Sequence, residues 1–299
     1  MKVPFINDAF FSRLETASLE LKSSLAGFFG GKHFVKTYGQ TVEFADYREY
    51  MLGDDIRRID WNLYSRFEKF FLKLFTDERQ MHTQIFFDCS ASMGKANPAK
   101  AQYAIGFAAA LGFLSVQNMD KLSFRFMKGE RTEDPFGVIV GKNNFYRLIP
   151  EVENITFDDE TDLEKAILSC YNVGNNDGLT VIISDFFTES NWKKAVDYLL
   201  FKKRQVLLVQ ILTPDEIEPT YDGRVHLLDA ESQDVLDDRN MKLRITRGMH
   251  QAYREAFADM VMDILTFTRS RGVEFVQVVS NNPIEQEIFG KLLKAGIMG

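Results

Sequence analysis

From residue 83 onward, short apolar runs alternate with longer segments whose apolar residues recur every three or four positions. The short runs have the length of buried strands, and the longer segments have the period of amphipathic helices. The pattern predicts strands at Thr83–Asp88, Lys121–Met127, Phe136–Val140, Leu179–Ser184, Gln205–Leu212 and Glu274–Val279. It predicts helices near Pro98–Gln117, Asn144–Val152, Asp162–Tyr171, Asn191–Phe201, Gly248–Arg271 and Pro283–Leu293. Right-handed crossovers between such strands give an α/β fold with a doubly wound, mostly parallel sheet.

The first 80 residues follow a different pattern. Residues 7–27 predict an amphipathic helix, and residues 36–83 alternate as in short strands. We therefore expect an N-terminal helix with a β-rich accessory segment over residues 1–80, and the parallel sheet over residues 81–299 with an inserted hairpin near 225–236. No Gly-, Ser- or Pro-rich linker lies between residues 66 and 83. We expect the β-rich segment and the hairpin to form a small layer beside the main domain.

Composition narrows the classes of function. The formal net charge of -7, without a run of five basic residues, argues against general binding to nucleic acid. Two cysteines and four scattered histidines provide neither a zinc-ligand spacing nor a disulfide framework. The N-terminal pattern contains charges, and the longest apolar run is shorter than a bilayer span. We expect a cytoplasmic protein that neither inserts into a membrane nor binds nucleic acid.

Oxygen-bearing side chains stand where predicted parallel strands end. Asp88 ends one strand and is followed by Ser90 and Ser92, while Asp185 directly follows another. The carboxyl ends of parallel strands meet at one edge of a sheet, which is where ligands bind in open α/β folds. Thr161 opens the helix predicted between these strands. Carboxylates and hydroxyls are the hard donors that magnesium, manganese and calcium prefer.

For each of these residues the alternative to metal binding is a local structural role, in a turn or as a helix cap. Asp88 and the two serines can close a turn and cap the next helix. Thr161-x-x-Glu164 has the pattern of a capping box, and a capping hydroxyl retains a lone pair for a metal. The pattern alone leaves both roles open.

The spacing Asp88-x-Ser90-x-Ser92, with a later Thr161 and a strand-terminal Asp185, resembles the metal-ion-dependent adhesion site of von Willebrand factor A domains. The resemblance extends from about residue 80 to the C-terminus. It implies a Rossmann-like fold in which these five residues bind one magnesium or manganese ion. It also implies an open coordination position that takes an acidic side chain of a protein partner.

Residues 53–61 read Gly-Asp-Asp-Ile-Arg-Arg-Ile-Asp-Trp. This is similar to the signature of a bacterial family, domain of unknown function fifty-eight, that is often encoded beside MoxR-type ATPases. The resemblance implies a MoxR-type AAA+ ATPase as partner, in the assembly or maturation of other proteins. From the residues themselves we expect an Arg–carboxylate network around a buried tryptophan ring, and a second binding surface is the alternative. The residues concerned are Asp54, Asp55, Arg57, Asp60, Trp61 and Arg66.

These features favour a metal-dependent interaction module that is not an enzyme. A magnesium-dependent phosphohydrolase using Asp88 as nucleophile is an alternative, but Ser90 stands where such enzymes have a second aspartate. A serine hydrolase lacks a histidine in a neighbouring strand-end loop to act as base. The third alternative is a scaffold that keeps the fold and binds no metal.

Overall fold

The structure, a computed structural model, describes residues 3–24, 43–51, 54–76, 81–95, 97–158, 160–174, 178–221, 223–227 and 241–292. The chain divides into two units. The larger unit contains residues 1–21 and 81–298, and the smaller contains residues 22–80. All five candidate metal ligands belong to the larger unit.

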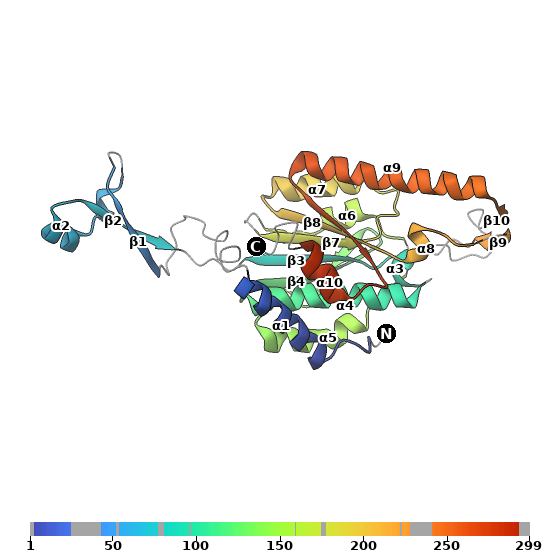
Figure 1. The fold of residues 1–299 in the computed structure, drawn as a ribbon, viewed down its shortest axis with the longest axis horizontal. Helices are drawn as coiled ribbons and strands as arrows, with labels where there is room; N and C mark the ends of the chain where they lie inside the picture. Colours follow the sequence, from blue (N-terminus) through green and yellow to red (C-terminus); the bar gives the residue numbers. More distant parts are fainter. Residues whose placement is uncertain are drawn as a thin grey trace. The chain divides into compact units, whose positions relative to one another are not determined.

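A seven-stranded sheet forms the centre of the larger unit (Figure 1). Its order is β11-β8-β7-β3-β4-β5, and β6 also pairs with β4. The strands from β11 to β4 are parallel to their neighbours, whereas β5 and β6 are antiparallel to β4. The expected α/β class with a mostly parallel sheet is therefore confirmed. The strands are β3 (His82–Asp88), β4 (Lys121–Lys128), β5 (Arg131–Glu133), β6 (Ile139–Val140), β7 (Leu179–Ser184), β8 (Gln205–Leu212) and β11 (Glu274–Val279).

Alternate residues of the buried strands build two separate cores, one on each face of the sheet. In β3, for example, Ile85 and Phe87 join one core and Phe86 joins the other. Helices α4 and α5 lie on the first face and α7 and α9 on the second (Figure 1). The helices are α1 (Asp8–Ser24), α3 (Ala91–Gly94), α4 (Pro98–Gln117), α5 (Lys142–Glu153), α6 (Leu163–Leu168), α7 (Trp192–Phe201), α8 (Pro214–Ile217), α9 (Arg247–Arg271), α10 (Ile284–Glu287) and the π-helical turn η2 (Ile288–Leu292).

Helix α4 is the central helix of the first core. Asn97 caps it by accepting hydrogen bonds from the amides of Ala99 and Lys100, and Pro98 occupies its first turn. Its length and apolar composition would suffice to cross a membrane, but most of its surface is buried inside the fold. Its cap fixes where the first turn lies relative to the edge of the sheet, which matters for the site described below.

Helix α1 packs in this same core, although the expected boundary near residue 80 grouped it with the β-rich segment. Phe10, Phe11 and Leu14 are all at most 3% exposed. The ring of Phe11 lies 4.9 Å from that of Phe113 on α4 and 5.6 Å from that of Phe145 on α5. The aromatic residues of α1 therefore belong to the core of the larger unit rather than to the smaller unit.

Two predicted elements differ from the structure. The strand expected at Phe136–Val140 is shortened to β6, which contains only its last two residues. Gly137 adopts a φ of +60°, which is not an extended conformation, so the strand does not include the residues before it. The hairpin expected within Val225–Leu236 is formed instead by β9 (Gly223–Leu227) and β10 (Met241–Ile245), in a two-stranded antiparallel sheet of its own. Its expected turn at 231–233 lies outside the described residues.

The smaller unit contains an antiparallel pair, β1 (Glu43–Glu49) and β2 (Phe71–Thr76), with an irregularity between Phe44 and Asp46. The stretch rich in charged residues between these strands forms a short 3-10 helix, η1 (Ile56–Arg58), and helix α2 (Trp61–Phe67). The expected β-rich character is found in these two strands, and α2 was not predicted.

Candidate metal centre

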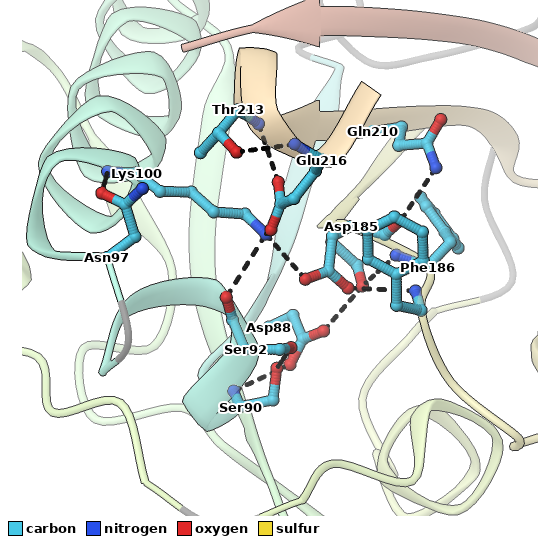
Figure 2. A network of polar contacts seen from close by, with 12 residues as sticks. Asp88, Ser90, Ser92, Asn97, Lys100, Asp185, Phe186, Gln210, Thr213 and Glu216 are labelled. Atoms are coloured by element: carbon cyan, nitrogen blue, oxygen red, sulfur yellow. Dashed lines mark hydrogen bonds and ion pairs between the residues drawn. The ribbon is translucent and has the colours of Figure 1, made fainter. Parts of the chain in front are cut away.

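Two strand-terminal aspartates meet at one edge of the sheet. The parallel register of β3 and β7 aligns Phe87 with Ile183. One residue further along, the Ser184 hydroxyl donates to Asp88 Oδ2 at 2.6 Å. Asp185 follows directly, and Asp88 and Asp185 are only 3% and 2% exposed. The register therefore brings both carboxylates into one buried, polar cluster at the carboxyl edge of the sheet (Figure 2).

The hydroxyls of Ser90 and Ser92 have no capping role. Ser90 is the N-cap residue of α3, but its side chain makes no cap hydrogen bond. Its amide instead donates to Asp88 Oδ1 at 2.9 Å, so Asp88 closes the turn. The two hydroxyl oxygens lie 3.0 Å apart beside Asp88 (Figure 2). Of the local roles open to this loop, the turn is found for Asp88 and the serine cap is not.

Thr161 does not cap the following helix either. The N-cap residue of α6 is Asp162, whose carboxylate accepts from the Lys165 amide at 3.0 Å. The Thr161 hydroxyl instead lies 3.5 Å from the carbonyl oxygen of Met127. That oxygen also accepts from the Cys89 amide at 3.1 Å. The predicted capping box is therefore wrong, and Thr161 lies buried beside Met127 near the end of β4.

Lys100, in the first turn of α4, is a residue of the site that was not predicted from the sequence. Its side chain is completely buried, and Nζ lies 2.8 Å from Asp185 Oδ2 and 2.7 Å from Glu216 Oε1 (Figure 2). Nζ also donates to the carbonyl oxygen of Ser92 at 3.3 Å. The sequence does set this residue apart, because Lys100 is the only charged residue in α4. A positive charge in the first turn of a buried helix opposes the helix dipole and requires a carboxylate partner.

Both carboxylate partners of this ammonium are fixed by nearby backbone. Glu216 belongs to a capping box of α8: its amide donates to Thr213 Oγ1 at 3.2 Å, and its Oε2 accepts from the Thr213 amide at 2.7 Å. Asp185 Oδ1 accepts from the Phe187 amide at 3.0 Å, and the Asp185 carbonyl accepts from Gln210 Nε2 at 2.8 Å. The polar cluster is therefore organised by its own hydrogen bonds.

The electrostatics of the cluster follow from its burial. Burial, and secondly the charge of Asp185, raise the pKa of Asp88 from 3.8 to about 6, although hydrogen bonds from neighbouring serines work in the other direction. Burial alone would lower the pKa of Lys100, but the carboxylates of Asp185 and Glu216 outweigh it and raise that pKa above its ordinary value. Lys100 is thus charged at neutral pH. Its two carboxylate partners are Asp185 and Glu216, and Asp88 lies near enough to Asp185 for that charge to raise its pKa.

These residues fit a hard divalent cation. The available donors are carboxylate and hydroxyl oxygens at a negatively charged edge. The Ser90 and Ser92 hydroxyls hydrogen-bond to each other at 3.0 Å. Adjacent ligands of an octahedral ion with bonds of about 2.1 Å also lie about 3 Å apart, so a cation could contact both oxygens without moving them apart. Among the described residues there is no cluster of three His, Cys, Asp or Glu side chains suited to a metal. The ligand set predicted from the sequence, Asp88, Ser90, Ser92, Thr161 and Asp185, contains two carboxylates and three hydroxyls.

The carboxylates of the smaller unit have structural partners. Asp54 forms an ion pair with Arg48 at 2.9 Å, and this hydrogen bond is the main cause of its lowered pKa. Asp55 caps η1 by accepting from the Arg57 amide at 3.0 Å. Asp60 caps α2 by accepting from the amide two residues later, and it also accepts from a tyrosine hydroxyl. These contacts favour the structural interpretation of the segment over a second binding surface.

The exposure of the Trp61 ring contradicts one part of that interpretation. We expected this ring to be buried, but it is 61% exposed. Helix α2 contributes no buried residue to the described part of this unit. The ring makes edge contacts with Tyr64 and Phe70, which stack on each other with centroids 4.5 Å apart. Arg66 lies in the last turn of the same helix and is exposed.

Comparison with known families agrees with the signature. A family model described as "Protein of unknown function DUF58" matches residues 46–263, which include β2, the second half of β1 and every candidate metal ligand. The chain belongs to the DUF58 family. Among its DUF58-like relatives is the uncharacterized protein Rv1480 of Mycobacterium tuberculosis, 30% identical over 225 residues that cover 73% of this chain and 70% of that protein.

Two solved structures show weaker likeness to this DUF58 protein. The conserved hypothetical protein BatB from Bacteroides thetaiotaomicron is 16% identical, with 72% of this chain and 98% of that chain covered and a TM-score of 0.44. A von Willebrand factor type A structure from Catenulispora acidiphila is 10% identical, with 46% and 34% covered and a TM-score of 0.34.

Proposed function

We propose that this protein is a metal-dependent interaction module that binds an acidic side chain of a partner protein and catalyses no reaction itself. The observation that carries the proposal is the pair of hydroxyls of Ser90 and Ser92, which lie 3.0 Å apart beside the buried Asp88 and cap no helix. The two hydroxyls hydrogen-bond to each other and keep lone pairs for a further ligand, next to a buried carboxylate with a raised pKa.

The carboxylate and hydroxyl residues of the site have different roles in binding a cation. Asp88 and Asp185 supply negative charge, whereas Ser90, Ser92 and Thr161 supply neutral donors that leave a cation's charge largely in place. A bound magnesium or manganese ion supplies a positive centre with a coordination position for a partner's carboxylate. Because the cluster is buried, the attraction for that carboxylate is weakly screened by solvent.

A phosphohydrolase with Asp88 as nucleophile fits the geometry less well. One carboxylate oxygen of Asp88 accepts from the Ser184 hydroxyl and the other from the Ser90 amide. Asp88 is also 3% exposed, which leaves its oxygens little room for the close approach of a phosphate ester. Ser90, two residues later, cannot act as the acid and base that such a reaction needs.

As partner we propose a MoxR-type AAA+ ATPase, with a role in the assembly or maturation of other proteins. Support comes from the Gly53–Trp61 signature and from membership of the DUF58 family. In this proposal a glutamate or aspartate of the ATPase occupies the open position at the metal. The partner would bind at the edge of the parallel sheet, where Asp88 ends β3 and Asp185 directly follows β7.

The test is binding of the purified MoxR-type ATPase from the same organism, measured by bio-layer interferometry with magnesium and with EDTA. We expect EDTA and Asp88→Ala each to abolish binding. Ser115→Ala is the matched control, because its buried hydroxyl donates to the Leu111 carbonyl on α4 and takes no part in the site; it should bind as the wild type does. Binding that survives both EDTA and Asp88→Ala would contradict the proposal, as would magnesium-dependent phosphatase activity that Asp88→Asn abolishes.

A further inference from the structure

We infer that Lys100 sets the affinity of this site for its metal, by holding the Asp185 carboxylate in an ion pair that competes with the cation. The inference rests on the metal centre proposed above and adds a residue outside its ligand set. It also assigns a role to Glu216, the second carboxylate in contact with the same ammonium.

The first support is that the ammonium of Lys100 is saturated. A lysine ammonium has three hydrogens to donate. Here Nζ has three acceptors, which are Asp185 Oδ2 at 2.8 Å, Glu216 Oε1 at 2.7 Å and the Ser92 carbonyl at 3.3 Å. The side chain is completely buried. Lys100 is therefore a fixed positive charge inside the protein, directly beside one of the two carboxylates that would face a metal.

The second support is the contrast between the two aspartates. Asp185 is paired with a full positive charge through Oδ2 and accepts from an amide through Oδ1. The partners of Asp88 are neutral groups, which are the hydroxyls of Ser184 and Ser90 and the Ser90 amide. A cation at this edge would thus face one uncompensated carboxylate, Asp88, and one whose charge Lys100 already balances.

Two consequences follow from this asymmetry. The affinity for metal alone is reduced, because a buried positive charge within a few ångströms repels the cation with little screening. The excess positive charge of a bound cation is also less neutralised by the protein, so an incoming carboxylate is attracted more strongly. Metal and acidic partner are therefore expected to bind cooperatively, with Lys100 as the residue that couples them.

Glu216 has the opposite influence on the metal. Its carboxylate balances part of the charge of Lys100, and its side chain is 28% exposed, so it stands between the cluster and solvent. Glutamine at this position can keep the capping box of α8, because both Glu and Gln are accepted there. Replacing Glu216 with Gln therefore removes a charge with little change in the local backbone.

The test is a titration with manganese alone, followed by electron paramagnetic resonance of the free ion at about pH 8, where the carboxylates are ionised. We expect Lys100→Met to tighten manganese binding by about tenfold or more, and Glu216→Gln to weaken it several-fold. The two changes have opposite signs, whereas simple damage to the fold would weaken binding in both variants. Melting temperature and circular dichroism of each variant, with and without manganese, identify any loss of structure.

The outcomes separate this inference from the proposed function. If the wild type binds manganese and Lys100→Met binds equally or more weakly while folded, Lys100 does not compete with the cation and the inference is wrong. If Lys100→Met does not fold, unchanged or tighter binding by Glu216→Gln contradicts it in the same way. If none of the three proteins binds manganese while all remain folded, the metal centre itself is wrong, and the inference is rejected with it.

Discussion

The Ser184 hydroxyl donates to Asp88 Oδ2 at 2.6 Å, across the paired ends of β7 and β3. The same hydroxyl accepts from the Phe186 amide at 3.0 Å. One side chain therefore orients the Asp88 carboxylate and the loop that carries Asp185. It lies beside the candidate ligands without belonging to them, so its removal tests how the site is supported.

Ser184→Ala should weaken metal binding without removing a ligand. Loss of the hydrogen bond leaves the Asp88 carboxylate less stabilised, so the pKa of Asp88 rises further above 3.8 and protons compete better with the metal. We expect a loss of about 1–3 kcal/mol in the free energy of unfolding and a weaker manganese affinity that is most evident near pH 6. Calorimetric titration with manganese at pH 6 and pH 8 measures this. Ser115→Ala loses a comparable buried hydrogen bond on α4 and should leave the affinity unchanged at both pH values.

Asp88→Asn should stabilise the metal-free protein at neutral and alkaline pH. In the folded protein the pKa of Asp88 is raised from 3.8 to about 6, so the folded state binds this proton more tightly than the unfolded state does. Its contribution to stability is complete below pH 3.8 and is lost as the pH rises through 6. Asn carries no charge, so the stability of the Asp88→Asn variant does not fall in this way as the pH rises.

Urea unfolding in a chelating buffer measures that difference. Between pH 4 and pH 8 the stability of the wild type should fall by about 2 kcal/mol relative to Asp88→Asn. A difference between the two proteins that does not change with pH would show that burial of a charged Asp88 is not costly to the fold.

Gly94 should be required for the loop to pack against its neighbours. A Cβ at this position would lie 2.5 Å from Cγ of Phe157 and 2.8 Å from Cβ of Ala101. Gly94→Ala should therefore destabilise the protein by about 1–3 kcal/mol through overpacking, and it should also displace the Ser92 hydroxyl and weaken manganese binding. Gly248→Ala is the control, because its nearest neighbour is 3.9 Å away; it should be neutral or slightly stabilising. A fully stable Gly94→Ala protein would contradict the close packing of α3.

Much of the fold could be predicted from local pattern. Leu179–Ser184, Gln205–Leu212 and Glu274–Val279 are strands with the predicted bounds, because continuous apolar runs bounded by polar residues specify buried parallel strands. Pro98–Gln117 is a helix with the predicted bounds, because Asn97 and Pro98 are strong signals for a helix start. The edge at which Asp88 and Asp185 end their strands follows from the same strand order.

The remaining features depend on partners distant in the sequence. Lys100 and Glu216 are 116 residues apart, and no local pattern indicates that they meet. The capping prediction for Thr161 was wrong by one residue because Asp162 is an equally good cap, and the start of α6 decides between them. The exposure of Trp61 depends on the arrangement of α2 relative to β1 and β2, which the charged sequence around it does not specify.

The central claim is that the carboxyl edge of the sheet binds a divalent cation through side-chain oxygens of the loop after β3. The most direct test is a crystal structure of the protein with manganese, in which anomalous scattering locates the ion. We predict one anomalous peak in direct contact with the Ser90 and Ser92 hydroxyls and directly or through one water with Asp88 and Asp185, absent from crystals of the Ser90→Ala, Ser92→Ala double variant. A well-ordered edge without any such peak at saturating manganese, or a peak bound only elsewhere, would contradict the account.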